Sequence, residues 1–385
     1  MINLLPLEGI TVVSLEQAVA APFATRQLAD LGARIIKIER PEVGDFARGY
    51  DNTVKGMSSH FVWLNRSKES LALDLKEEES KQILETLLSK ADVFIQNLAP
   101  GAVDRLGFSP DVLKEKFPQL IICSISGYGS YGPYRDKKAY DLLVQCEAGL
   151  LSITGTEEHP SKSGISIVDI ATGMYAYAGI LTALLTRYKS GRGTVMEVSM
   201  LEAIGEWMGY PVHYSSSGIE PKRTGADHAT IFPYGPFKAG DQKSVFLGIQ
   251  NEREWGRFCK VVLNSPDLAM DPQFNSNAKR VENKELLKTI IQSEFKKFTA
   301  SEIIDRLEEA KIANARMNTI TDFIHHPQLQ ARNRWREVDS PVGPIQMLIP
   351  PVTFEEIDFV IKPIPKVGEH NESILKEIGW KAKRN

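Results

Sequence analysis

Strand-like and helix-like segments alternate through residues 10–125, and this alternation constrains the fold more than any other feature of the sequence. Five short runs rich in β-branched residues predict strands: "ITVVSL", "ARIIKIE", "SLALDL", "DVFIQN" and "LIICSIS". Between them, "PFATRQLADLG" and "EEESKQILETLLSKA" have the apolar spacing of helices. Such alternation predicts an α/β fold with a largely parallel sheet covered by helices, and ligands bind such sheets beyond the carboxyl ends of the strands.

The second half of the chain has a different pattern. Residues 210–237 are rich in Gly, Pro and Ser, which predicts a linker of irregular structure. A strand-like run, "SVFLGIQ", and three helical segments, "NEREWGRFCKVV", "NKELLKTIIQSEFKKF" and "ASEIIDRLEEAK", predict a smaller α/β domain over roughly residues 225–325. A Pro-rich passage and a short terminal helix, "NESILKEIGW", follow.

Composition excludes several classes of protein. With 385 residues, 42% hydrophobic residues and a net charge of −3, the chain is predicted to be a soluble protein of two domains without a surface for nucleic acid. Cys123, Cys146 and Cys259 are widely spaced, which favours a reducing cytoplasm without disulfides. The N-terminus does not resemble a signal peptide. The longest apolar stretch, Ile170–Thr186, suits a buried helix better than a membrane span.

A glycine pattern after the strand "LIICSIS" raises the possibility of a dinucleotide site. Gly127, Gly129 and Gly132 form G-x-G-x-x-G. In a true fingerprint these glycines open a helix whose N-terminus holds the pyrophosphate. Here "PYRDKKAYD" follows, which has no helical apolar period. We therefore predict a loop and no NAD site, although the glycines allow a ligand to approach the backbone closely.

Asp169 is the most suggestive candidate for chemistry. It ends the apolar run Ile165–Val168 and heads a helix rich in small residues, which allow a neighbouring backbone or a ligand to come close. Asp is a favoured helix cap, so a purely structural role is one interpretation. The other is an ionised carboxylate that acts as a nucleophile. Spacing alone leaves both open.

Other candidate residues are weaker. The histidines are isolated or, at His325 and His326, lie in a loop without a third ligand, so no metal site is predicted. No G-x-S-x-G, P-loop or paired-cysteine motif occurs. Cationic residues follow predicted strand ends or turns, and together they are suited to binding phosphates: Arg40, Lys76, Arg105 and Lys138.

The chain resembles the class III CoA-transferases, the family of formyl-CoA and carnitine CoA-transferases, almost from end to end. The resemblance rests on an ordered series of segments: "LEGITVVSLEQAVAAPFATRQLADLGARIIKIERPEVGD", "LNRSKESLALDLK", "NLAPGAVDRLGF", "SGYGSYGPYRDKKAYD", "IVDIATGMYAYAGILTALLTRYKSGRGTVMEVSMLEA" and "PKVGEHNESILKEIG". It implies a Rossmann-like large domain formed by residues 1–200 and 351–385, a small domain at 226–325, and linkers at 201–225 and 326–350. It also implies a homodimer of two interlocked, ring-like subunits.

The resemblance further implies a mechanism in which Asp169 attacks the carbonyl of an acyl-CoA. A mixed anhydride forms, the released CoA thiolate attacks the aspartyl carbonyl, and an enzyme–CoA thioester remains until an acceptor acid reverses the steps. CoA is then a substrate, and neither a metal nor a permanently bound cofactor is implied. Matching positions are expected to bind CoA: Ala18, Val19, Ala20, Arg40, Leu73, Lys76, Asn97, Leu98, Arg105, Leu106, Lys138, Tyr140 and Met200. Others are expected to orient the acceptor: Asp141, Gly248 and His228.

Two differences from related sequences narrow the range of reactions that we expect this chain to catalyse. Formyl-CoA transferase has a run of glycines where this chain reads "FLGIQNEREW", with only Gly248, which disfavours oxalate–formate exchange. "HATIFPYGPFKAG" is more similar to relatives that use succinyl-CoA with dicarboxylic or aromatic-succinate acceptors.

The related α-methylacyl-CoA racemases have a His directly before the Asp that matches Asp141. This chain has Tyr140 there, a poor base with an unperturbed pKa of about 10. A non-enzymatic acyl-CoA-binding protein remains an alternative if Asp169 is only a cap.

Overall fold

The computed structural model describes residues 5–380, which divide into two compact units. The large unit comprises residues 5–149, 163–210 and 330–380, and the small unit comprises 150–162 and 211–329. Residues 150–162 therefore cluster with the small unit, although they lie within the range predicted for the large domain. The large unit is discontinuous in sequence, as the resemblance implied.

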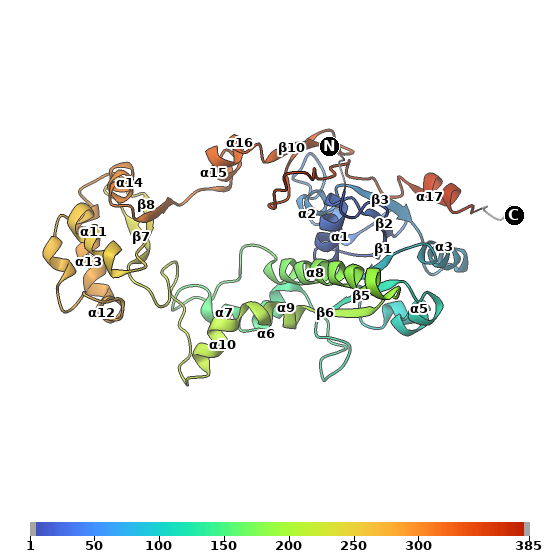
Figure 1. The fold of residues 1–385 in the computed structure, drawn as a ribbon, viewed down its shortest axis with the longest axis horizontal. Helices are drawn as coiled ribbons and strands as arrows, with labels where there is room; N and C mark the ends of the chain where they lie inside the picture. The colour runs from blue at the N-terminus through green and yellow to red at the C-terminus, as the bar shows by residue number, and fades with distance from the viewer. Residues whose placement is uncertain (1–4, 381–385) are drawn as a thin grey trace. The chain divides into compact units, whose positions relative to one another are not determined.

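A parallel sheet forms the centre of the large unit (Figure 1). Its six strands are β1 (Thr11–Leu15), β2 (Arg34–Glu39), β3 (Lys68–Ala72), β4 (Val93–Gln96), β5 (Ile121–Ser126) and β6 (Val195–Ser199). Their order is β3-β2-β1-β4-β5-β6, with every pair parallel, which is the order of the Rossmann fold. The predicted sheet is thus confirmed. The edge strand β6 was not predicted, because Glu197 interrupts a run of only three apolar residues.

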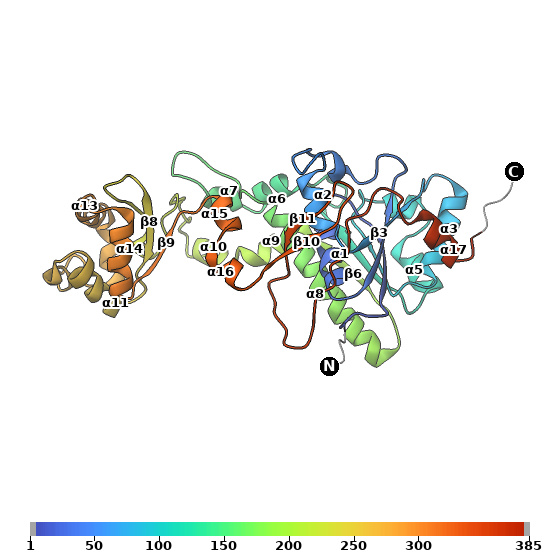
Figure 2. The same cartoon turned by 90° about the horizontal axis from the view of Figure 1, so that it is seen from above.

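Helices cover both faces of this sheet, and successive strand residues serve the two faces in turn. Val12 packs with α1 (Ala20–Asp30) and α8 (Ile167–Ser190), whereas Val13 packs with α3 (Glu78–Leu88), α5 (Pro110–Lys116) and α17 (Asn371–Glu377). Figures 1 and 2 show α1 and α8 side by side on the first face. The remaining elements of this unit are shorter: the 3₁₀ helix η1 (Phe46–Gly49), α2 (Ser59–Leu64), α4 (Ala102–Arg105), α6 (Asp141–Glu147), α9 (Met200–Trp207), and the hairpin β10 (Trp335–Val338) and β11 (Ile345–Leu348).

The small unit packs helices against a three-stranded antiparallel sheet. The sheet contains β7 (Tyr234–Lys238), β8 (Ser244–Gly248) and β9 (Ala313–Arg316). Its helices are α7 (Leu150–Ile153), α11 (Glu252–Arg257), which continues as a π-helical turn to Val262, η3 (Pro266–Ala269), α12 (Asn277–Glu282), α13 (Lys284–Phe295), α14 (Ala300–Glu309) and α15 (Ile320–Ile324). Two more helices, α10 (Gly209–Ser215) and α16 (Pro327–Ala331), lie at the boundaries between the units. The predicted linker 210–237 is therefore irregular only between α10 and β7.

Several features predicted to be structural are confirmed. The glycine-rich segment after β5 opens no helix, since the next helix begins only at Asp141. All three cysteines are free. Among the described residues, α8 alone is long and apolar enough to cross a membrane. It packs against α1, α9 and β5 and contributes buried residues such as Ala176 and Ile180, which indicates a core helix of this unit.

Candidate active site

Most of the predicted CoA-binding positions lie at one edge of the large sheet. The turn 17–19 follows β1, Arg40 follows β2, Leu73 follows β3, Asn97 follows β4 and Met200 follows β6. Because all six strands are parallel, these positions lie at their carboxyl ends along the same edge. The fold therefore brings together residues that are up to 180 positions apart in the sequence.

Close packing of α1 and α8 places Asp169 beside the turn 17–19. Gly173 lies one helical turn after Asp169, on the same face of α8. A Cβ atom at Gly173 would lie only 2.6 Å from the carbonyl oxygen of Ala20, the first residue of α1. Only glycine permits so close an approach. The small residues that drew attention to this helix thus have a defined role, which is to seat it against the start of α1.

Asp169 does not cap its helix. The helix begins at Ile167 with Ser166 as its N-cap, so Asp169 lies inside the first turn. Its carboxylate has no hydrogen-bond or ion-pair partner among residues 5–380. The capping interpretation of Asp169 is therefore wrong, and its role as a nucleophile stays a prediction. An ionised carboxylate in the first turn is favoured by the helix dipole.

Asp141 supplies the cap instead. Its Oδ1 atom accepts hydrogen bonds from the backbone N–H groups of Val168 at 2.8 Å and Asp169 at 3.2 Å. Its Oδ2 atom accepts one from Gln145 Nε2 at 2.5 Å. Both carboxylate oxygens are therefore engaged in holding the first turn of α8. This geometry indicates a role in positioning Asp169. The predicted part of Asp141 in orienting the acceptor acid stays a prediction.

The environment raises the pKa of the Asp169 carboxyl to about 7. Burial contributes most, and the negative charge of Asp141 adds to it. The group is thus ionised above neutral pH and is more basic than an ordinary carboxylate. A basic carboxylate in a partly desolvated position is suited to attacking a carbonyl carbon.

A tightly held turn, Gln17–Val19, directly precedes α1, whose first residue lies against α8. Asn97 brackets Gln17, since its Oδ1 accepts from the Gln17 N–H at 2.8 Å and its Nδ2 donates to the Gln17 carbonyl at 2.9 Å. On the other side, the Ala18 N–H donates to Asp45 Oδ1 at 2.9 Å. Asn97 therefore shapes the turn through its side chain. Sequence reasoning named Asn97 but missed Asp45, which no motif marks.

The predicted phosphate-binding cations are exposed. Arg40 lies over the ring of Phe46, with 4.8 Å between the guanidinium carbon and the ring centroid, and Arg105 donates to the carbonyl of Pro100 at 3.5 Å. Lys76 and Lys138 are also exposed. The apolar members of the predicted set belong to packed clusters: Leu73, Leu98, Leu106 and Met200. Tyr140 is 70% exposed just before α6.

Two residues that were predicted to orient the acceptor acid, His228 and Gly248, lie in the small unit, and both lie beside Tyr234. The His228 ring stacks on Tyr234, with ring centroids 4.9 Å apart and an interplanar angle of 11°. A Cβ atom at Gly248 would lie 3.3 Å from the same Tyr234 ring. His228 and Gly248 therefore flank one aromatic side chain. Arg223, another basic residue of the small unit, donates to the backbone carbonyls of Thr156 and Glu157.

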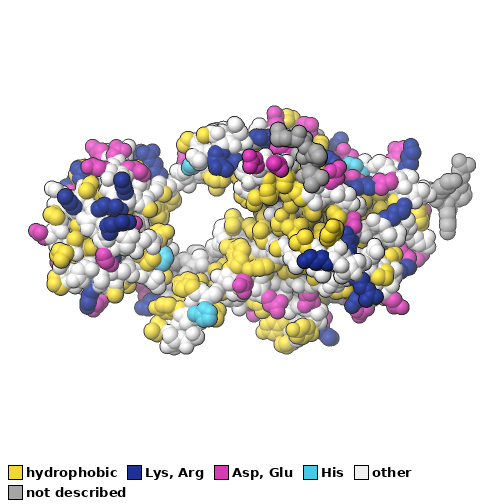
Figure 3. Space-filling model, in the orientation of Figure 1, with side chains coloured by type: hydrophobic (Ala, Val, Ile, Leu, Met, Phe, Trp, Pro, Cys, Tyr) yellow, Lys and Arg dark blue, Asp and Glu magenta, His cyan; other side chains and the backbone are white. Residues whose placement is uncertain are grey.

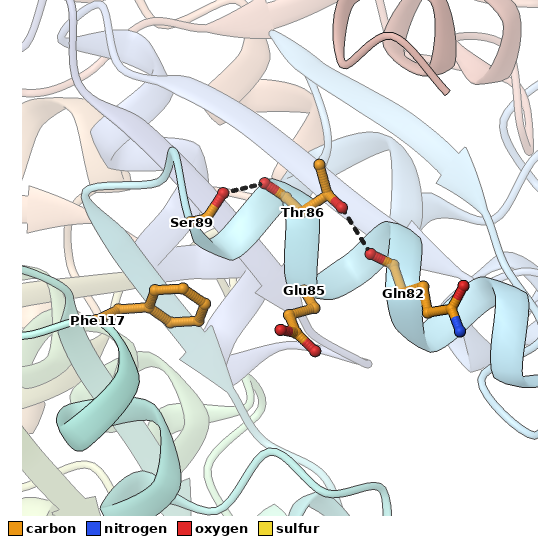
Figure 4. A pocket seen from close by; sticks show the side chains of 5 residues that line it. All are labelled: Gln82, Glu85, Thr86, Ser89 and Phe117. Atoms are coloured by element: carbon orange, nitrogen blue, oxygen red, sulfur yellow. Dashed lines mark hydrogen bonds between the residues drawn. The ribbon is translucent and has the colours of Figure 1, made fainter. Parts of the chain in front are cut away.

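A shallow pocket elsewhere on the large unit does not coincide with these residues (Figure 4). It is lined by α3 residues and by Phe117, and its side chains bond locally, as from Thr86 Oγ1 to the Gln82 carbonyl at 2.8 Å. Within residues 5–380, no group of three or more His, Cys, Asp or Glu side chains is arranged to hold a metal ion.

Comparison with known proteins identifies the family of this chain. The model of the CoA-transferase family III matches residues 7–371. Succinyl-CoA:glutarate CoA-transferase of Mus musculus is 33% identical over 378 residues, covering 97% of this chain and 86% of the mouse protein. Succinate–glutarate CoA-transferase of Agrobacterium fabrum is 32% identical, covering 97% and 96%. The chain belongs to CoA-transferase family III, and it is a CoA-transferase.

Solved structures show the same fold. A CaiB/BaiF family protein from Brucella suis has a TM-score of 0.85 at 31% identity, covering 97% of this chain and 99% of that one. A hypothetical protein from Mycobacterium tuberculosis has a TM-score of 0.86 at 28% identity, covering 97% and 99%. The resemblance stated from the sequence is therefore confirmed.

Proposed function

We propose that this enzyme transfers CoA from succinyl-CoA to a small dicarboxylic acid, with Asp169 as the nucleophile. The observation that carries the proposal is the unpaired Asp169 carboxylate, with its raised pKa, in the first turn of a helix seated against the carboxyl edge of the sheet. That edge is where α/β proteins of this topology bind their ligands.

The proposed chemistry proceeds through two covalent intermediates on Asp169. An Asp169 oxygen attacks the acyl carbonyl of succinyl-CoA, and the C–S bond breaks to give a mixed anhydride and CoA thiolate. The thiolate attacks the aspartyl carbonyl and releases succinate, which leaves an aspartyl–CoA thioester. The acceptor carboxylate attacks the carbonyl of this thioester, and the C–S bond breaks to give a second mixed anhydride and CoA thiolate. The thiolate then attacks the acceptor carbonyl of that anhydride, which forms the new acyl-CoA. Asp169 is regenerated, and no net proton transfer is required.

The relatives support a dicarboxylic acceptor. Among them are a succinyl-CoA:glutarate CoA-transferase and a succinyl-CoA:mesaconate CoA-transferase. His228, stacked on Tyr234, is the candidate hydrogen-bond donor to the second carboxylate through its Nε2 atom, since its Nδ1 accepts from the Thr230 N–H at 3.2 Å. No observation favours the racemase alternative, because Tyr140 occupies the place of its histidine and the relatives named above are CoA-transferases.

A homodimer is part of the proposal, and the surface of α8 supports it. Apolar side chains on this helix are left exposed, among them Met174, Tyr175, Leu185 and Tyr188, with Leu185 at 68% and Tyr188 at 91%. Figure 3 shows hydrophobic side chains gathered over this part of the large unit. Exposed apolar patches of this kind mark interfaces. The expected measurement is a dimer mass by light scattering, and a monomer at micromolar concentration would contradict it.

The acceptor is tested with acids that differ only in the second charge. With succinyl-CoA as donor, glutarate should exceed pentanoate in kcat/KM by about 10²-fold or more, about 3 kcal/mol. A pocket built around the distal carboxylate would leave its hydrogen-bond donor unpaired with a monocarboxylate. Itaconate, mesaconate, citramalate and malate complete the panel, with butyrate, formate, oxalate and carnitine as comparisons.

The panel separates the parts of the proposal. If butyrate or carnitine is used as well as the dicarboxylates, the second-charge idea is wrong while CoA transfer stands. A His228→Ala variant should lower kcat/KM for glutarate and leave the low pentanoate value unchanged. Equal losses for both acids would exclude His228 as the partner of the distal carboxylate.

A further inference from the structure

Ala18 has a backbone conformation that an alanine rarely adopts. Its φ angle is 60°, in the left-handed region, and it lies in the turn between β1 and α1. A non-glycine residue held there costs about 1–2 kcal/mol. Such conformations persist only where the surrounding structure enforces them, and they gather at functional sites. The question is therefore what holds Ala18 and for what purpose.

A single carboxylate holds Ala18 in place. Asp45 Oδ1 accepts from the Ala18 N–H at 2.9 Å and from the Ala47 N–H at 2.9 Å, and Oδ2 accepts from Lys37 Nζ at 2.6 Å. Asp45 thus ties the turn after β1 to the 3₁₀ helix η1 and to strand β2. It is 1% exposed.

Behind Asp45 lies a closed network of buried charges. Lys37 Nζ also donates to Glu16 Oε1 at 3.2 Å, and Lys68 Nζ donates to the same oxygen at 2.7 Å. The side chains of Glu16, Lys37 and Lys68 are all fully buried. Two carboxylates and two ammonium groups balance in charge. Buried ion networks add little net stability compared with apolar packing, so their presence calls for another reason.

We propose that Asp45 is a positioning residue for CoA transfer: its carboxylate holds Ala18 in the left-handed conformation and so fixes the turn 17–19 beside the helix that carries Asp169. The inference rests on the proposed function of Asp169. Asp45 is itself held in place by Lys37, whose ammonium group donates to Asp45 Oδ2. Lys37 is in turn held by Glu16.

The location of the turn explains why its position matters. It joins β1 to α1, and the Ala20 carbonyl at its end lies against α8 at Gly173, one helical turn from Asp169. A displacement of about 1 Å in a group that positions a substrate can cost about 10²-fold in rate. A relaxed turn should therefore impair the chemical step more than it impairs CoA binding.

The first test compares Asp45→Asn with a matched loss elsewhere in the large unit. Asp30 is also 1% exposed, and it accepts from Arg66 twice, each at 2.8 Å, without touching the turn. Asp45→Asn should lower kcat with succinyl-CoA at least about 30-fold, with less than about threefold change in KM. Asp30→Asn should lower the melting temperature and leave kcat within about threefold. An equal loss of kcat in both variants would overturn the proposal.

The second test relieves the strain. In an Ala18→Gly background the left-handed conformation carries no steric cost, so Asp45 has less to enforce. Asp45→Asn should then lower kcat by less than about fivefold relative to Ala18→Gly alone. The same factor in both backgrounds would show no coupling between the two residues and would contradict the proposal.

A third pair of variants leaves Asp45 in place, in case Asp45→Asn fails to fold. Asn tolerates the left-handed region and Val does not, although the two side chains have similar size. Ala18→Asn should keep at least about tenfold more kcat than Ala18→Val. Equal activities would contradict a requirement for the left-handed conformation.

Hydrogen exchange at the Ala18 amide tests the geometry without any substrate. Protection should be present in the wild type and in Asp30→Asn and lost in Asp45→Ala, which has no side-chain oxygen to accept from the Ala18 N–H; unchanged protection would overturn the proposal. A wild-type enzyme that transfers no CoA would overturn the proposed function together with the positioning role. A wild type that does transfer CoA, with no coupling between Ala18 and Asp45, would overturn the positioning role alone.

Discussion

The two units differ in the side chains that fill their interiors, which are largely aromatic in the small unit and include a network of charges in the large unit. The small unit closes around aromatic side chains, including Phe237, Trp255, Phe258 and Phe295, and Arg280 is the buried charge among its described residues. The large unit buries a network of four charged side chains: Glu16 and Asp45, which follow β1 and β2, Lys37 within β2, and Lys68 at the start of β3. The first kind of core is sufficient for stability. Burial of the charged side chains in the large unit costs desolvation free energy. This charged network lies behind the turn 17–19, which we propose it holds in place.

The largest expected effect separates chemistry from structure at Asp169. Asp169→Asn should lower CoA transfer at least about 10⁴-fold, about 5.5 kcal/mol, because the amide cannot form the anhydride. Affinity for CoA and the melting temperature should stay close to wild type. The check is steady-state turnover with succinyl-CoA and glutarate. Turnover within about tenfold of wild type would remove Asp169 from the role of nucleophile.

The next effect compares the two interiors directly by their stability. Lys37→Met leaves buried carboxylates without one of their cations, and Phe258→Ala leaves a cavity in the aromatic core. Each should cost about 3–5 kcal/mol near pH 7. Thermal unfolding at several pH values distinguishes them.

The sign of the pH dependence follows from Glu16. Its neighbours Lys68 and Lys37 outweigh burial and lower its pKa to about 2, so the unfolded chain binds the proton more readily. Stability from this network is present above about pH 4.5 and is lost as pH falls toward 2. The Lys37→Met penalty should therefore shrink in acid, whereas the Phe258→Ala penalty should not. If the stability penalties of both variants changed with pH in the same way, the contrast between the two interiors would be wrong.

A smaller effect concerns the pH at which the nucleophile ionises. With a pKa of about 7, Asp169 should give a kcat/KM for succinyl-CoA that rises with pH to a plateau above neutrality. Asp141→Asn keeps an oxygen acceptor for the first turn of α8 and removes the like charge. The midpoint should shift to lower pH by up to about one unit, but burial should keep it above the ordinary aspartate value. A midpoint that moves upward would contradict the electrostatic role of Asp141.

The smallest effect concerns the exposed cations. Arg40→Ala should raise the KM for succinyl-CoA about tenfold and change kcat little, because phosphate binding is shared by ground and transition states. Arg253→Ala, an exposed arginine of the small unit, is the control and should change neither. A fall in kcat with unchanged KM would contradict a role for Arg40 in anchoring CoA.

The sequence predicted what local patterns determine. Strands β1 to β5 and the helices between them follow from alternation of short β-branched runs with amphipathic segments, and Asp169 stands out by its place before a helix of small residues. The edge strand β6 was missed because Glu197 interrupts its short apolar pattern. The capping of α8 by Asp141 was missed because its hydrogen bonds span 27 residues.

The buried network was missed for a related reason. Lys37 lies within the apolar run "RIIKIE", where alternation suggests a lysine that faces solvent. Its partners Glu16 and Asp45 are 21 and 8 residues away, in segments that the sheet order brings together. Pairing of charges across a fold leaves no periodic signal in one sequence. The lysine inside a buried strand was the only available indication.

The most direct test of the account is the covalent state of Asp169 during turnover. Wild-type enzyme incubated with succinyl-CoA, without acceptor, should carry CoA as a thioester on the peptide that contains Asp169, as read by mass spectrometry. Hydroxylamine should release the CoA and leave a hydroxamate at that residue, and Asp169→Asn should carry none. CoA bound to a different residue, or transfer by an enzyme that never carries CoA, would contradict the account.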